Sequence, residues 1–215
     1  AFSRDWLGED TLAEEAFFLA ALLADLMPDD PEVLGLAALI AYTLSREDAR
    51  VRDGQFVDLE HQDTSCWDHD LIDCAGAYLT RAQAQNALGR FQLEAAIQTV
   101  HADRRVTGAT DWTALAQLHL GLSRIAPTIG SAIGHAAAVG IAMGPAEGLK
   151  ALYQVDAKAR AAFAPAEVTR AYLLSELGQT HEAIAAYERA IALTVEKPLR
   201  RYLESKRAAL DGRPI

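Results

Sequence analysis

The sequence predicts an all-α fold of stacked helix pairs, on three observations. The chain is 51% hydrophobic, and Ala and Leu dominate over β-branched runs. Apolar residues recur at the 3.6-residue spacing of amphipathic helices along most of the 215 residues. A short segment near the C-terminus also has an echo 35 positions later. We therefore expect about ten helices in a single domain over residues 1–215, with an ordered loop or small hairpin near 46–63.

The echo pairs residues 144–155 with residues 179–190, so that Gly148 falls on Ala183 and Leu152 on Tyr187. Small residues where helices cross, with larger apolar residues between them and a period near 34, are typical of tetratricopeptide (TPR) arrays and similar α-solenoids. Gly148, Ala183 and Tyr187 are therefore expected to be structural. Such arrays present surfaces to other macromolecules, which favours an interaction module over an enzyme.

The N-terminal segment predicts two helices. The first begins at Thr11 and ends before Pro28, and the second begins after the capping residue Asp30, with Pro31 at its first helical position. The residues expected to be buried in the first helix form one stripe: Leu12, Ala16, Leu19, Ala20, Leu23 and Leu26.

Residues 46–63 interrupt the helical pattern. Asp53 and Gly54 form a tight-turn dipeptide between apolar residues, which indicates an ordered loop or a small hairpin. Ser65, with Asp68 three positions later, predicts a capping box that opens the next helix and places Trp67 inside it.

The remaining segments predict further helices. Thr110 and Asp111 cap a helix that begins near Trp112, and helices follow near 129–142, 145–158, 165–177 and 180–193, with a last one from Pro198. Trp67 and Trp112 lie near helix starts, where a large ring covers the end of a bundle, so both are expected to be structural. The chain divides into acidic N-terminal helices with a loop (1–64), central helices (65–126), a TPR-like repeat pair (127–197) and a terminal helix (198–215).

Charge is unevenly distributed. Residues 1–74 hold 18 Asp and Glu against 4 Arg and Lys, whereas residues 75–215 hold 12 against 16. An acidic first third does not suit a phosphate backbone, whose affinity comes from Lys and Arg. It suits a basic protein partner, or it serves solubility alone, and both interpretations stay open. The basic last helix either contacts nucleic acid or an acidic partner, or complements the helix dipole.

The densest polar cluster lies between residues 58 and 73. Its carboxylates and histidines suit a hard metal or acid–base chemistry in principle, but no spacing matches a known ligand set. We therefore assign no catalytic, metal-binding or cofactor-binding residue and expect no cofactor. Five members of the cluster are candidate partner-contact residues: Asp58, Glu60, Gln62, Asp63 and Asp68. Outside it, His101 and His119 fall beside apolar stripes and are expected to be core histidines satisfied by hydrogen bonds.

Two features bear on the cellular compartment. Cys66 and Cys74 are expected on one helix, eight residues and about 12 Å apart, which is too far for a disulfide. Free thiols agree with a reducing compartment. No signal-peptide pattern and no apolar run of about 20 residues is present, so a cytoplasmic protein is expected.

The order of segments resembles one family, the TPR-like C-terminal extension of a group of bacterial extracytoplasmic-function (ECF) RNA polymerase sigma factors. The resemblance is collinear from about Glu14 to Leu210. Five segments account for it: 22–36, 59–68, 91–97, 110–112 and 144–149. The most specific is Leu59–Asp68, which contains the Gln-Asp and Trp-Asp pairs of the family run. The chain departs from the family at Thr64 and Cys66, where a basic residue is usual, and at Gly134–His135, where Asn-Arg is usual.

The resemblance implies a cytoplasmic bacterial protein of transcription initiation, with no enzymatic activity. The promoter-reading and polymerase-binding regions would precede Ala1. This portion would bind the sigma factor's own N-terminal regions, the RNA polymerase core, or both, and would reach promoter DNA only through the N-terminal half. The alternatives are a metal-dependent, hydrolase-like enzyme that uses the 58–73 cluster, and a freestanding TPR-like scaffold.

Overall fold

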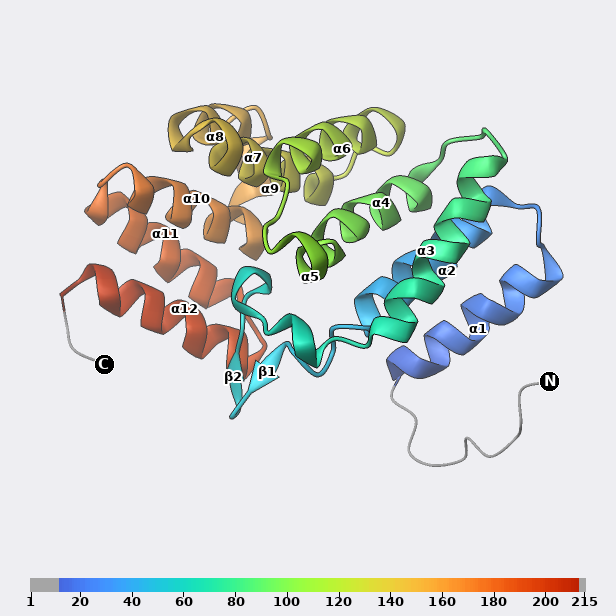
Figure 1. The fold of residues 1–215 in the computed structure, drawn as a ribbon. Coiled ribbons are helices and arrows are strands. Elements are labelled where there is room, and N and C mark those ends of the chain that lie inside the picture. Colours follow the sequence, from blue (N-terminus) through green and yellow to red (C-terminus); the bar gives the residue numbers. More distant parts are fainter. Residues whose placement is uncertain (1–11, 213–215) are drawn as a thin grey trace. The chain divides into compact units, whose positions relative to one another are not determined.

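The computed structural model describes residues 12–212 and confirms an all-α helical fold (Figure 1). Thr11, the expected start of the first helix, lies outside the described residues. The contacts gather into two compact units. The first unit comprises residues 12–49 and 63–109, and the second comprises 50–62 and 110–212. These boundaries differ from the subdivisions expected at 64, 126 and 197, and the single domain stays a prediction.

In the first unit, α2 is the central helix. The elements of this unit are α1 (Leu12–Leu26), α2 (Pro31–Leu44), a 3₁₀ helix η2 (Thr64–Cys66), α3 (His69–Ala84), α4 (Arg90–Ala102) and α5 (Arg104–Thr107). Helix α2 packs against α1, α3 and α4. It begins as expected, because the Asp30 carboxylate accepts hydrogen bonds from the amides of Glu32 and Val33. Gly35 lets α4 approach closely, since a Cβ there would lie 2.7 Å from the Gln92 nitrogen.

The start of α4 is capped from a distance. Gly89 is its N-cap residue and has no side chain to donate or accept. Instead, the Glu32 carboxylate of α2 accepts hydrogen bonds from the amides of Phe91 (3.0 Å) and Gln92 (3.3 Å). A Cβ at position 89 would lie 2.2 Å from the Glu32 carboxyl carbon, so the glycine leaves room for this cap.

The buried stripe expected for the first helix is wrong. Helix α1 packs through Ala20 and Ala24, in a cluster with Leu34 and Ala37 of α2. Leu12, Leu19, Leu23 and Leu26 of the expected stripe are exposed. The helix is apolar nearly all round, so its periodicity did not select one face, and its alanines suit the close approach to α2.

A short antiparallel hairpin forms in the second unit, as expected. Strands β1 (Val51–Arg52) and β2 (Gln55–Phe56) pair Val51 with Phe56. Asp53 (φ 52°) and Gly54 (φ 73°) both adopt positive φ, which is the backbone of a type I′ turn. A 3₁₀ helix, η1 (Leu59–His61), follows the hairpin.

The capping box expected at Ser65 is absent, and two aspartates cap instead. Asp63 accepts hydrogen bonds from the Ser65 amide and hydroxyl at the start of η2, and Asp68 accepts from the Leu71 amide at the start of α3. Trp67 is extended (ψ 144°) and ends η2, so it lies outside α3. Cys66 therefore does not share a helix with Cys74, although both thiols are free.

The second unit is a succession of helices, each packed on a neighbour. Its helices are α6 (Trp112–Ile125), α7 (Ile129–Met143), α8 (Pro145–Leu152), α9 (Ala157–Ala161), α10 (Ala164–Glu176), α11 (Thr180–Leu193) and α12 (Lys197–Leu210). Packing runs from α6 to α7, α8, α10, α11 and α12. The helix expected over 145–158 instead ends at Leu152, and Asp156 caps the separate helix α9 by accepting from the Ala159 amide.

The repeat pair has the close crossings that the echo predicts. A Cβ on Gly148 would lie 2.6 Å from the Cα of Gly140, so α7 and α8 touch backbone to backbone. Ala183 and Tyr187 of α11 are buried in the core of this unit, together with Leu152. Ala183 and Tyr187 are therefore buried where the echo places them, and Gly148 lies at a close helix crossing.

Candidate partner-contact site

The five candidate contact residues fall into two groups. Asp58, Glu60 and Gln62 belong to the second unit, and Asp63 and Asp68 belong to the first. We describe each group within its own unit.

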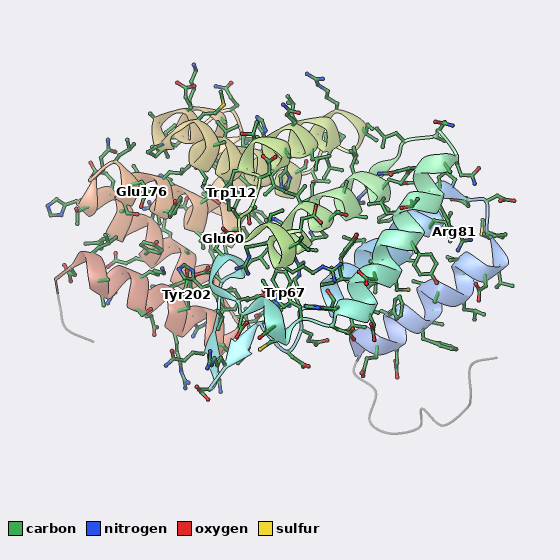
Figure 2. All side chains as sticks on the ribbon, viewed as in Figure 1. Glu60, Trp67, Arg81, Trp112, Glu176 and Tyr202 are labelled. Atoms are coloured by element: carbon green, nitrogen blue, oxygen red, sulfur yellow. The ribbon has the colours of Figure 1, made fainter. Side chains whose placement is uncertain are left out.

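Asp58 fastens the hairpin segment to α12. Its Oδ1 lies 2.6 Å from His61 Nδ1, and its Oδ2 accepts a 2.7 Å hydrogen bond from the Tyr202 hydroxyl. The Phe56 ring meets the Tyr202 ring edge to face at 5.4 Å (Figure 2 labels Tyr202). Lys206 Nζ also lies over the Tyr202 ring, 5.2 Å from its centroid. Asp58 is thus held inside the unit by two partners.

The protonation of this contact follows from its surroundings. Partial burial alone would raise the pKa of Asp58, but the hydrogen bonds from His61 and Tyr202 outweigh it, and the pKa of this carboxyl is lowered. Burial, and then the hydrogen bond to the Asp58 carboxylate, raise the pKa of Tyr202. The ionised carboxylate and the neutral phenol therefore stabilise each other.

Glu60 and Gln62 differ in their availability. Glu60 is exposed, and its Oε1 accepts a 2.8 Å hydrogen bond from the Thr110 hydroxyl at the entrance to α6 (Figure 2). Gln62 is only 6% exposed, and its Nε2 donates to the Val57 carbonyl. Glu60 can therefore meet a partner, whereas the Gln62 side chain is not available to one.

A small pocket opens beside the Asp58 contact. It has a volume of about 200 Å³ and is lined by Phe56, Val57, Asp58, His61, Tyr202 and Lys206. Asp58 and His61 could act as an acid–base pair, but no Ser or Cys lines the pocket as a nucleophile. Among residues 12–212, no group of three or more His, Cys, Asp or Glu side chains is placed to hold a metal ion. The absence of catalysis and of a cofactor stays a prediction.

The part of the Leu59–Asp68 segment that belongs to the first unit is centred on Trp67. Trp67 (labelled in Figure 2) is 4% exposed, and two guanidinium groups lie over its ring, with Arg104 at 5.1 Å and Arg46 at 5.9 Å from the ring centroid. Arg46 is itself buried and donates to the Gln98 side chain. Of the two tryptophans expected to be structural, Trp67 is buried and Trp112 is half-buried.

Asp63 and Asp68 combine a structural role with exposure. Each caps a helix through its side chain, and the Asp68 amide also donates to the Ser45 carbonyl at 2.8 Å. Both carboxylates are nevertheless exposed. Within the candidate set, negative charge is therefore presented by Glu60, Asp63 and Asp68.

His119 differs from the expected core histidine. Its Nδ1 is buried without a hydrogen-bond partner among the described residues. Burial, and then the proximity of His135, lower the pKa of His119 to about 4, so the ring is neutral at pH 7. A Cβ at Gly134 would lie 2.3 Å from His119 Cε1. The absence of a side chain at Gly134 therefore makes room for this ring.

Sequence reasoning missed one feature of interest, which is an exposed apolar face on α1. Phe18, Leu19, Leu22, Leu23 and Leu26 are all exposed there. The low polarity of residues 12–26 was visible in the sequence, but the direction of each side chain was not.

None of the helices in residues 12–212 is both long enough and apolar enough to span a membrane.

Comparison with known proteins gave two matches. Residues 2–83 match a profile described as "Family of unknown function (DUF6596)". The chain is also similar to "Uncharacterized protein R00370" of Rhizobium meliloti (strain 1021), with 32% identity over 204 residues. That alignment covers 94% of this chain and 48% of the relative, so the chain spans about half the length of the curated relative it matches. No solved structure matches.

Proposed function

We propose that this chain is a non-catalytic, protein-binding regulatory domain of an ECF-type RNA polymerase sigma factor. The observation on which the proposal rests is the segment Leu59–Asp68, the most specific part of the resemblance. Its members have defined places in the fold: Gln62 is buried, Asp63 and Asp68 cap helices, and Trp67 is buried with two arginines over its ring. A motif whose residues each meet a structural need supports a fold shared with that family.

Two further findings support the proposal. The helices of the second unit pack in succession, as in arrays that bind other macromolecules. The Rhizobium meliloti relative is about twice as long as the region that matches this chain. That length leaves room in the relative for another region, which in our proposal would hold the promoter-reading and polymerase-binding helices.

The proposed mechanism is electrostatic docking. Residues 1–74 hold 18 acids against 4 bases, which suits the basic DNA-binding region of a sigma factor. The exposed acids Glu60, Asp63 and Asp68 would contribute, while Asp58 is already engaged by Tyr202 and His61. Occupying that basic surface would tune its access to promoter DNA. Docking of this kind acts mainly on the association rate and weakens with salt.

The reading frame that precedes Ala1 provides the first test. The proposal expects it to encode two helical regions, the second ending in a basic helix-turn-helix. A start codon directly before Ala1 would contradict the proposal.

Binding in trans provides the second test. The chain is titrated with those upstream regions and, separately, with the RNA polymerase core, at 0.1 M and 1 M salt. The Debye length falls from about 10 Å to about 3 Å between these conditions, so we expect a weaker association at high salt. The combined variant Glu60→Gln, Asp63→Asn and Asp68→Asn should weaken binding, and Glu204→Gln in α12 is the matched control. Circular dichroism first establishes that the combined variant keeps the helix content of the unsubstituted chain. An affinity indifferent to salt and to these substitutions excludes the electrostatic mechanism.

A further inference from the structure

The outward side of α1 is an apolar surface that no sequence pattern predicted to be exposed. Its large side chains define the α1 outer face: Phe18 (60% exposed), Leu19 (62%), Leu22 (46%), Leu23 (37%) and Leu26 (72%). Positions 18, 19, 22, 23 and 26 follow the three- and four-residue spacing of one side of a helix. The five side chains therefore lie together in one stripe rather than being scattered.

The opposite side of α1 explains why this stripe is left outside. Ala20 and Ala24 are buried against α2, in a cluster that also contains Ala82 of α3. The small side chains let α1 lie close to its neighbours, and the large ones then project away from them. An outer helix of a helical array ordinarily presents a polar side to water. A contiguous apolar stripe on such a helix is typical of an interaction surface.

The charge around the stripe indicates the kind of partner. Residues 12–45 contain no Lys or Arg, and their acids are Glu14, Glu15, Asp25, Asp29, Asp30 and Glu32. Asp30 and Glu32 cap α2 and α4. Glu15, Asp25 and Asp29 are exposed and free of such a role. Arg81 of α3 also reaches the end of α1, where its Nη2 donates to the Pro28 carbonyl, so the rim of the stripe has these three acids against this base. A second copy of this chain, or an anionic membrane, would bring like charges together at that rim.

We propose that the α1 outer face docks an amphipathic helix of a partner protein, whose apolar side covers the stripe and whose flanks carry Lys or Arg. A helix is the occupant that fits, because stripes spaced by three and four residues interdigitate with those of another helix. The inference rests on the proposed function in that it specifies the chemistry of the bound partner. In that setting the partner helix would belong to the sigma factor's own basic region.

The test uses a defined probe and the full 215-residue chain. The probe is a labelled peptide of Leu and Lys with every Leu on one helical side, about 18 residues or five turns long. Its control is a peptide of the same composition in scrambled order. Binding is measured by fluorescence anisotropy at low salt. We expect the patterned peptide to bind, and the scrambled peptide to bind at least about tenfold more weakly.

Substitutions in the chain locate the binding surface. The variant Leu19→Gln, Leu22→Gln and Leu26→Gln removes the stripe while keeping good helix formers. Leu88→Gln is the matched control, because Leu88 lies in the same unit, outside any helix, and is also 62% exposed. We expect at least about a tenfold loss of affinity for the triple variant and less than about twofold for Leu88→Gln. Circular dichroism confirms that each variant is folded. Unchanged binding by the folded triple variant, or no binding by the unsubstituted chain, overturns the proposal.

If something other than a partner helix covers the α1 outer face, the measurements show it in one of three ways. A dimer in sedimentation that the triple variant abolishes would assign the face to a second copy and overturn the proposal. Peptide binding that emerges only after deletion of residues 1–11 would assign it to the chain's own N-terminal segment, with the same result. Stripe-dependent binding to phosphatidylcholine–phosphatidylglycerol vesicles would also overturn it.

The design separates this inference from the proposed function. The peptide assay contains no sigma-factor region, so a contradicting reading frame upstream of Ala1 leaves its result standing. Conversely, if the upstream regions bind the triple variant as tightly as the unsubstituted chain, the sigma-factor proposal survives and the docking proposal fails.

Discussion

The first and last described helices, α1 and α12, differ in which of their apolar residues they bury. They have similar lengths, 15 and 14 residues. In α12 the large apolar residue Leu203 is fully buried, and the exposed side is polar: Lys197, Arg200, Arg201, Glu204 and Lys206. In α1 the alanines are buried and the leucines are exposed. The largest apolar side chains of a helix therefore need not mark its buried face.

Polarity explains the difference. The sequence of α12 has a single apolar stripe, so one orientation buries it and exposes the charges. Its Arg200 also donates to the Thr194 carbonyl at the end of α11, which fixes the start of α12. The sequence of α1 lacks any base and is apolar on two sides, so the fit to α2 decides which side is buried. A helix with charges on one side can bury its single apolar stripe, whereas a helix that is apolar on two sides leaves one of them exposed.

The same substitution at the two ends should have very different effects. Leu203→Ala in α12 should lower the free energy of unfolding by about 2–5 kcal/mol, because it leaves a cavity in a fully buried site. Leu19→Ala in α1 should change it by less than about 0.5 kcal/mol, because that side chain is mostly in water. Urea unfolding followed by circular dichroism measures both. Equal losses at the two positions would mean that the α1 outer face is covered in solution.

Acid should distinguish the units to which these helices belong. His119, in the second unit, has a pKa lowered from 6.5 to about 4, so the folded state binds fewer protons than the unfolded state between these values. Stability should therefore be full above pH 6.5 and fall by about 3 kcal/mol as the pH drops to about 4. The lowered pKa of Asp58 acts only at still lower pH.

Hydrogen exchange at several pH values measures this loss as opening free energies for each unit. His119→Gln should remove the slope between pH 4 and 6.5. A loss confined to α6–α12 would mean that the units open separately, and an equal loss in α2 would support the single domain expected from the sequence. If the opening free energy of the second unit did not change between pH 4 and 6.5, the burial of His119 would be contradicted.

The polar anchor of α12 should matter less than its buried leucine. Tyr202→Phe removes the hydroxyl that donates to Asp58, and the loss should be about 1–2 kcal/mol, since the carboxylate loses a charge-assisted partner. Tyr172→Phe, at a partly exposed tyrosine of α10, is the control and should cost less than about 0.5 kcal/mol. Chemical denaturation at pH 7 compares the two. A Tyr202→Phe loss larger than that of Leu203→Ala would place the main attachment of α12 at its polar contact.

Much of the fold followed from local signals in the sequence. Asp30 and Asp111 cap the helices they were expected to cap, and α11 has the expected bounds of 180–193. Asp53–Gly54 forms the hairpin turn because the turn needs positive φ at both positions, and the dipeptide Asp-Gly adopts that conformation readily. These features depend on a few neighbouring residues, which the sequence displays directly.

The misses depend on distant residues. The burial of α1 is decided by its fit to α2, and the placement of the His119 ring depends on Gly134 of the next helix. In the candidate site, the negative charge of Glu60, Asp63 and Asp68 was predicted, but the burial of Gln62 and the engagement of Asp58 by Tyr202 were not. Tyr202 lies 144 residues from Asp58, beyond the reach of any local pattern.

The placement of the tryptophans has an optical consequence. Trp67 belongs to the first unit, where it is buried with two guanidinium groups near its ring, and Trp112 belongs to the second, where it is half-buried. With Trp6→Phe, replacing either one leaves a chain whose emission reports a single unit. Coincident transitions from two such probes are a standard sign of all-or-none unfolding. The chain therefore contains its own pair of label-free reporters, one for each half of the molecule.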